Sequence, residues 1–390
     1  MTFAQRVINL EPEGAYAVLA RAQALEAQGR EIIHMEIGQP DFQTYPNISL
    51  AGVKAIAEGY TRYNPAAGYP QLRQVIARDA SARRGIEIRP TQVVVGPGGK
   101  PGLFFTAMAL IEPGAGDEVL YPNPGYSTHW AMIDISGGKA VPVPLVEEKG
   151  FSFDLEAFDA LVNERTKIVV INSPANPTGG VIPLKDLEHI AAAAHKYDFW
   201  VISDEIYSRL VFDGQQAPSI ATLPGMQERT IIVDGFSKTY AMTGWRLGYA
   251  IMPEALASRV ELLLNHAIGC TASFTQMAGI EALTGPQDAV DHVLAAYQAR
   301  RDRIVAGLNA IPGVSCQTPQ GAFYAFPNVK SFGLPSKQLA DRILDEAGVS
   351  LLSGTDFGKY GEGYLRLSFA TSMEVINQGL ERLADFCARL

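Results

Sequence analysis

The sequence predicts an α/β fold, with a large domain whose mostly parallel sheet is covered by helices on both faces, and a smaller α+β domain. Short apolar runs alternate with segments of helical periodicity over most of the 390 residues. This alternation is typical of parallel sheets. It stops at about residue 285, and a chain of this length is expected to form two or three domains.

Short apolar runs are expected to form the strands of the large domain. They lie at residues 92–95, 118–121, 140–143, 167–171, 199–202, 230–233 and 248–251. Segments with apolar residues at helical spacing lie between them, at residues 71–81, 101–111, 126–135, 184–195 and 254–266. This order of elements predicts a sheet whose strands are joined mainly by helices.

The C-terminal part has a different order of elements. A long helix, two strands and a final helix are expected at about residues 286–310, 322–326, 363–368 and 373–388. The N-terminal segment has its own strand at residues 31–35 and is expected to pack with this part. We therefore predict a large domain over residues 46–285 and a small domain built from residues 1–45 and 286–390.

Composition and charge argue against several classes of function. The net charge is −9 and no stretch of five or six like charges occurs, which argues against a nucleic-acid partner. No apolar run approaches the roughly 20 residues of a membrane span, and the start of the chain lacks the apolar core of a signal peptide. Three widely separated cysteines predict a cytoplasmic protein without disulfides. The histidines show no metal-ligand spacing, so no metal site is expected.

Lys238 is the strongest candidate for catalysis. It follows the expected strand at residues 230–233, directly after Ser237 and shortly before Arg246. A partly desolvated lysine has a lowered pKa and becomes a nucleophile, so Lys238 suits a Schiff base with pyridoxal phosphate (PLP). Ser237 and Arg246 are expected to hold the phosphate. The alternative is an ordinary surface lysine, since most lysines are solvated.

A glycine-rich segment at residues 96–102 predicts an anion site. It follows an expected strand and opens an expected helix, so its backbone N–H groups and the helix dipole favour a phosphate. The spacing of its glycines fits neither a nucleotide P-loop nor the dinucleotide fingerprint. The alternative is a tight turn without a ligand.

Further polar and aromatic residues supply what PLP chemistry needs. Asp204 ends an expected strand, where ligands of parallel sheets bind, and would keep the pyridine nitrogen protonated. Tyr207 shares a helical face with it, Asn176 would donate to a ring oxygen, and Tyr126 would stack on the ring. The alternatives are an aspartate that caps the next helix, an ordinary loop and plain packing.

Arg366 alternates with apolar residues in the expected strand at residues 363–368. Its neighbours therefore face one side of the strand and Arg366 faces the other. An arginine buried in a sheet needs an anion, and a carboxylate bound by both nitrogens is its natural partner. We expect a substrate carboxylate there, and the alternative is an internal salt bridge.

Taken together, these positions resemble the class I and II aminotransferases, which are fold type I PLP enzymes, along nearly the whole chain. Gly38 in its Gly-x-Pro-Asp-Phe segment and Tyr63 extend the match. The resemblance implies that PLP is bound by Gly98, Gly99, Lys100, Tyr126, Asn176, Asp204, Tyr207, Ser237, Lys238, Arg246 and, from the neighbouring subunit of a homodimer, Tyr63. It implies substrate contacts from Gly38, Asn176 and Arg366, and catalytic roles for Lys238, Asp204 and Tyr207.

The resemblance also implies ping-pong transamination between an L-amino acid and a 2-oxo acid, of aspartate or alanine type. Lys238 would then act as general base and acid at the substrate Cα. One alternative is another PLP reaction on the same fold, by a β-lyase, a decarboxylative or an oxidative enzyme. A PLP-fold regulator is not expected, because few residues precede Gly38 and no basic patch occurs.

Two charged residues bear on the choice of substrate. Lys100 is shared with a subset of bacterial aspartate aminotransferases, where this lysine is thought to hold the distal carboxylate; alternatively, it faces solvent. Glu13 does not favour a dicarboxylate, and it would attract a basic or neutral substrate or lie outside the pocket. Phe274 and Tyr324 are candidate pocket walls.

Overall fold

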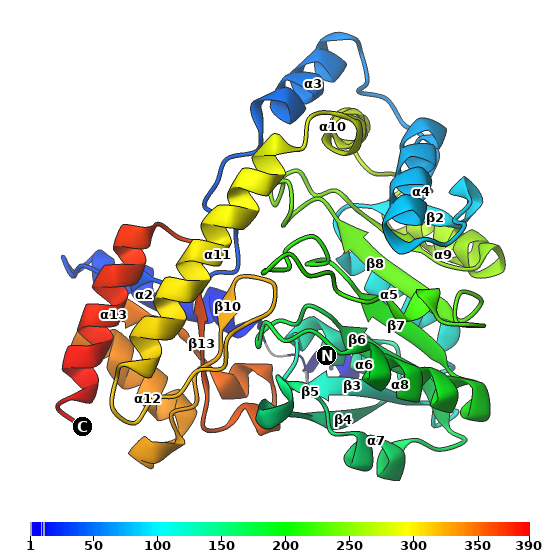
Figure 1. Ribbon diagram of the computed structural model, residues 1–390. Helices are drawn as coiled ribbons and strands as arrows, with labels where there is room; N and C mark the ends of the chain where they lie inside the picture. Colours follow the sequence, from blue (N-terminus) through cyan, green and yellow to red (C-terminus); the bar gives the residue numbers. More distant parts are fainter. Residues whose placement is uncertain (1, 9, 11) are drawn as a thin grey trace.

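An eight-stranded sheet forms the centre of the computed structural model, which describes residues 2–8, 10 and 12–390 (Figure 1). Its order is β2 (Val93–Gly96), β9 (Gly248–Ile251), β8 (Thr230–Gly235), β7 (Trp200–Asp204), β6 (Thr166–Asn172), β3 (Glu118–Asn123), β4 (Lys139–Val146) and β5 (Ser152–Phe153). The pairs from β8 to β4 are parallel, whereas β9 and β5 run antiparallel to their neighbours. The predicted mostly parallel sheet is confirmed.

Helices cover both faces of this sheet. Ile168 and Val170 of β6 belong to one apolar cluster, whereas Val169 and Ile171 belong to another. The first cluster includes residues of α5 (Lys100–Leu110), α6 (Ser127–Ile135) and α9 (Glu254–Ala267), and the second includes residues of α7 (Leu155–Leu161) and α8 (Leu184–Tyr197). Because both faces are covered, the strands are continuous apolar runs in the sequence.

A smaller sheet forms a second region, drawn in yellow to red in Figure 1. Its order is β10 (Tyr324–Ala325), β13 (Leu365–Ser368) and β12 (Leu352–Ser353), and its helices are α11 (Asp288–Asn309), α12 (Ser336–Arg342) and α13 (Met373–Cys387). From the N-terminal segment, which begins with α1 (Gln5–Ile8), β1 (Ile33–His34) pairs with β11 (Val349–Ser350), and α2 (Gly14–Glu26) packs on β11 and β12. The division at residues 45 and 285 stays a prediction.

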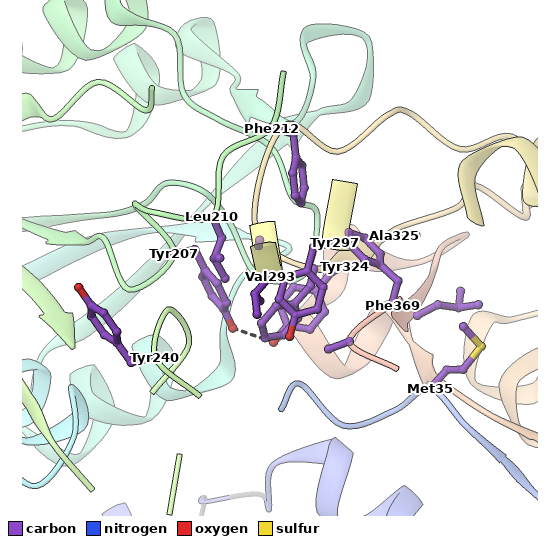
Figure 2. Packing of buried hydrophobic residues seen from close by; sticks show 14 of the residues in the cluster. Met35, Tyr207, Leu210, Phe212, Tyr240, Val293, Tyr297, Tyr324, Ala325 and Phe369 are labelled. Atoms are coloured by element: carbon purple, nitrogen blue, oxygen red, sulfur yellow. Dashed lines mark hydrogen bonds between the residues drawn. The ribbon is translucent and has the colours of Figure 1, made fainter. Parts of the chain in front are cut away.

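The largest apolar cluster contains residues of both regions. Figure 2 shows Tyr207 and Phe212, which follow β7, beside Tyr324 and Phe369 of the second region. The ring centroids of Tyr207 and Tyr324 are 5.8 Å apart, and those of Phe212 and Phe369 are 6.3 Å apart. This continuous core holds the two regions together, so side chains from both can share one cavity.

Most predicted elements occur with shifted ends. The helix expected at residues 71–81 is α4 (Pro70–Arg84), and the one expected at residues 184–195 is α8. Each ends at a residue in the left-handed conformation, Gly85 (φ 68°) or Asp198 (φ 55°), which stops a helix but is hard to foresee for an aspartate.

Six α-helices of the described residues have no counterpart in the sequence prediction: α1, α2, α3 (Pro46–Ala57), α7, α10 (Ser273–Thr284) and α12. Two of them, α3 and α10, pack against each other at the top of Figure 1. Leu50, Val53 and Ile56 lie exposed on α3, so its apolar residues do not form a single buried stripe. Among the described residues, no helix combines the length and the apolar character needed to cross a bilayer.

Candidate active site

A cavity of about 620 Å³ lies where the carboxyl ends of β6, β7 and β8 meet the second region. Ligands of parallel sheets bind at this edge. The predicted site residues that line it are Gly38, Gly99, Lys100, Tyr126, Asn176, Asp204, Tyr207, Ser237, Lys238, Arg246 and Arg366. Glu13 and Tyr324 also line it, whereas Phe274 does not. Positions spread over most of the sequence therefore meet in one place.

Lys238 lies in the turn after β8 and points into this cavity. Its Nζ donates a hydrogen bond to the backbone oxygen of Gly38 at 2.6 Å. The pKa of Lys238 is lowered to about 8. Burial is the largest cause, and the nearby positive charges of Arg366 and Arg246 add to it. About a tenth of such lysines are neutral, and so nucleophilic, at pH 7, which is a few hundred times the fraction for an ordinary lysine.

Asp204 is the last residue of β7, and its carboxylate is buried in the cavity wall. Its Oδ2 accepts a hydrogen bond at 3.0 Å from Nε2 of His129 on α6, which is also buried. Its Oδ1 accepts from the backbone N–H of Ile206, and a turn rather than a helix follows. The carboxylate is thus held by a histidine that the sequence analysis missed, because a lone histidine on a helix has no diagnostic spacing.

Tyr207 and Tyr324 place two phenol groups in the same wall. Their hydroxyl oxygens are 2.7 Å apart. Burial raises the pKa of Tyr207 well above its ordinary value, so its phenol stays protonated and can donate. A side chain at Gly38 would collide with the Tyr324 hydroxyl. Glycine is therefore required where the N-terminal segment passes the cavity.

Arg366 lies on β13 with its guanidinium buried between two rings. The guanidinium carbon is 4.6 Å from the ring centroid of Tyr324 and 5.0 Å from that of Phe357. It donates to Asn176 Oδ1 at 3.3 Å and to the backbone oxygen of Glu36, and Nε has no partner among the described residues. An internal salt bridge does not explain this arginine, because each of its partners is an uncharged oxygen. Its geometry suits an incoming carboxylate.

Arg246 and the start of α5 form a second anion-binding arrangement. Gly98 has φ 91°, and a Cβ there would lie 2.5 Å from Nη2 of Arg246. Arg246 donates to the backbone oxygens of Thr243 and Pro97, at 2.9 and 3.3 Å, which leaves its charge without a carboxylate partner among the described residues. Ser237 lines the cavity nearby. A guanidinium, a hydroxyl and a helix N-terminus are the donors that a phosphate needs.

Lys100, the first residue of α5, does not present a free charge to the cavity. Its Nζ donates a hydrogen bond to Oε1 of Glu13, just before α2. Glu13 therefore lies inside the pocket, and not outside it as one of the sequence alternatives had it.

Tyr63 lies away from the cavity of its own chain. Its side chain is 96% exposed, and it is absent from the cavity lining. Gly98 is also outside the lining, although it contacts Arg246 there. Any role for Tyr63 at an active site therefore needs a second copy of the chain.

The family model for aminotransferase class I and II matches residues 30–383. An aspartate aminotransferase of Pyrococcus abyssi is 38% identical over 357 residues, which are 91% of each chain. An aspartate aminotransferase of Musicola paradisiaca is 35% identical over 384 residues, 98% of this chain and 96% of the relative. The solved structure of an alanine aminotransferase from Pyrococcus furiosus covers 100% of both chains, with a TM-score of 0.94 and 33% identity. Sequence and fold thus agree over almost the full length.

Proposed function

The chain belongs to the class I and II aminotransferase family, and we propose that it works with PLP bound at Lys238. It moves an amino group from an L-amino acid to a 2-oxo acid. The other PLP reaction types are not favoured, because the relatives described above are aminotransferases. The observation that carries the proposal is that the largely buried Lys238 amine shares one cavity with two guanidinium groups, Arg246 and Arg366, which have no carboxylate partner among the described residues.

The residues of the cavity fit PLP. Arg246, Ser237 and the backbone around Gly98 and Gly99 would hold the phosphate, since Arg246 approaches Gly98 so closely that a side chain there would displace it. Asp204 would pair with the ring nitrogen. Tyr126 would cover the ring, with Asn176 and Tyr207 donating to the ring oxygen, and all three line the same cavity.

Each side chain then has a defined task in transamination. Arg366 binds the α-carboxylate of the amino donor through charge-assisted hydrogen bonds, which orients Cα. Lys238 takes the Cα proton at Nζ and returns it, for which a pKa near 8 is well suited. Asp204, which accepts a hydrogen bond from His129, would stabilise a proton on the ring nitrogen of bound PLP. When bound, PLP supplies the electron sink for the charge left on Cα.

The donor is proposed to be of aspartate or alanine type. Support comes from relatives and neighbours that carry these two names, at 33 to 38% identity. At this level of identity, the reaction of a relative carries over more reliably than the identity of the amino-acid side chain that it accepts.

We also propose a homodimer with shared active sites. Tyr63 is exposed in the single chain, and Leu50, Val53 and Ile56 of α3 leave an apolar face open to solvent. Such a face is typical of a surface that a second copy covers. In that dimer Tyr63 would reach the phosphate of the partner's cofactor.

An absorbance titration tests the proposed function. The protein is loaded with PLP, and single L-amino acids are added without a 2-oxo acid. A suitable donor should bleach the visible PLP band completely, and a 2-oxo acid should restore it. If PLP binds but no donor bleaches the band, the reaction proposed here is wrong.

A further inference from the structure

Glu13 and Lys100 form an ion pair inside the cavity, on the side formed by α2 and α5. Oε1 of Glu13 accepts a hydrogen bond from Lys100 Nζ. Both side chains line the cavity and both remain partly exposed to solvent. The pair therefore joins the N-terminal segment to the start of α5 at a point that a substrate side chain can reach.

Glu13 is not placed there to cap a helix. It occupies the N-cap position of α2, yet its side chain makes no capping hydrogen bond. The carboxylate turns toward α6 instead, where Tyr126 Oη and Thr128 Oγ1 donate to the same Oε1 at 3.4 and 3.3 Å. Three donors converge on one oxygen, so the fold holds this carboxylate in the cavity, where it neutralises Lys100.

The positively charged side chains of the cavity wall therefore differ in whether they are free to bind an anion. The partners of Arg366 and Arg246 are uncharged oxygens, so both remain available to anions. Lys100 already has a carboxylate partner. A second substrate carboxylate would have to replace Glu13 at Lys100 and leave Glu13 without its cation.

A further carboxylate lies on the same side of the cavity. Asp356 lines it, and a Cβ at Gly14, next to Glu13, would lie 2.8 Å from Asp356 Cγ. Oδ2 of Asp356 is buried without a partner among the described residues. Two carboxylates, Glu13 before α2 and Asp356 of the turn at residues 354–357, thus lie on this side of the cavity. Lys100, the cation that pairs with Glu13 among the described residues, is already occupied.

We propose that Glu13 determines substrate choice by occupying Lys100, so that the cavity accepts L-amino acids without a side-chain carboxylate in preference to aspartate and glutamate. Alanine is the simplest such donor. The inference rests on the proposed function, since it concerns the substrate of that same site. It assigns Glu13 a role in discrimination and none in the chemical step.

The test compares kcat/KM for alanine and aspartate in four PLP-loaded proteins: the natural chain, Glu13→Gln, Lys100→Met and the double variant. The natural chain should favour alanine. Glu13→Gln keeps the size of the side chain and frees the Lys100 charge, so the aspartate-to-alanine ratio should rise at least about tenfold. In the double variant this gain should disappear, because the freed cation is gone.

A binding measurement gives a readout besides activity. Titration calorimetry on the PLP-loaded protein compares succinate with butyrate, which lacks the second carboxylate. Glu13→Gln should tighten succinate binding at least about tenfold and leave butyrate binding unchanged. Asp356→Asn is the matched comparison: it removes one negative charge from the same cavity while Glu13 still occupies Lys100, so it should tighten succinate binding less than Glu13→Gln does.

Three results would overturn the inference. They are a natural chain that prefers aspartate and loses this preference with Lys100→Met, no response of the ratio or of succinate binding to Glu13→Gln, or an equal response to Asp356→Asn. All three leave transamination itself intact. Failure of the proposed function would look different, since no donor would then bleach the PLP band in any of the proteins.

Discussion

The inner wall of the cavity, formed by Lys238, Asp204 and Arg366, differs from its outer residues, Glu13 and Lys100, in how firmly the fold holds each side chain. Asp204 and Arg366 are buried and Lys238 largely so, and each is hydrogen bonded to a neighbouring segment. Glu13 and Lys100 keep 29% and 45% of their side chains exposed. The inner groups are thus built into the core shared by both regions, whereas the outer groups can change without disturbing it.

This difference predicts how readily the residues of each group can be replaced. A buried charge that loses its partner is strongly destabilising, so the inner wall tolerates few replacements. An exposed ion pair contributes little to stability, so Glu13 and Lys100 can be exchanged to suit another substrate. Relatives with the same reaction and different donors are the expected result.

The largest effect is expected at the inner wall, with Lys238→Ala. The variant removes the amine that binds the cofactor and moves the proton, so kcat should fall at least about 10⁴-fold. Borohydride treatment followed by peptide mass spectrometry should find PLP fixed to Lys238 in the natural chain and to no residue in the variant. Lys196→Ala is the control, because Lys196 is a solvent-exposed lysine on α8 and should leave both results unchanged.

Arg366→Lys should have the next largest effect. Lysine keeps the positive charge and loses the planar fork that binds a carboxylate through two nitrogens, so kcat/KM for every amino donor should fall about 100-fold. PLP affinity should not change, because Arg366 is assigned to the substrate.

Arg301→Lys provides the matched control for this replacement. Arg301 is also buried, but it pairs with Asp213 away from the cavity. An equal loss of kcat/KM in both variants would show that the effect comes from disturbing a buried arginine and not from substrate binding.

The sequence predicted the inner wall better than the outer residues. The sheet strands are continuous apolar runs, and Asp204 ends one of them while Lys238 follows another. Both positions follow from the rule that ligands bind at the carboxyl ends of parallel strands. Arg366 stood out because a charge alternates with leucines in β13.

The remaining features depend on contacts between distant segments. The partner of Lys100 lies at position 13, and the partner of Asp204 lies at position 129, and no local pattern links either pair. The helices α3 and α10 were missed for a related reason. Some of their apolar residues lie between the two helices, and others, on α3, are exposed to solvent. Neither helix therefore shows the single apolar stripe that periodicity detects.

The pH dependence of covalent PLP binding tests the environment of Lys238 in the inner wall. The neutral amine of Lys238 is the nucleophile, and its pKa is lowered to about 8. The rate at which the apoprotein binds PLP covalently should therefore fall about tenfold per pH unit below that value and level off above it. Stopped-flow absorbance measures this rate. A midpoint near 10, the value of an ordinary lysine, would show that the cavity does not activate the amine.

Tyr63 should give the smallest effect, because it is the most exposed of the proposed site residues. If its hydroxyl reaches the partner's cofactor phosphate, Tyr63→Phe removes one partly solvated hydrogen bond and should weaken PLP binding about fivefold. Tyr360→Phe, at another exposed tyrosine, should leave PLP affinity unchanged. Analytical ultracentrifugation should find both variants dimeric, since neither change removes apolar area from α3. A fully active monomer would contradict the role of Tyr63 and, with it, the proposal that a second copy of the chain completes the active site.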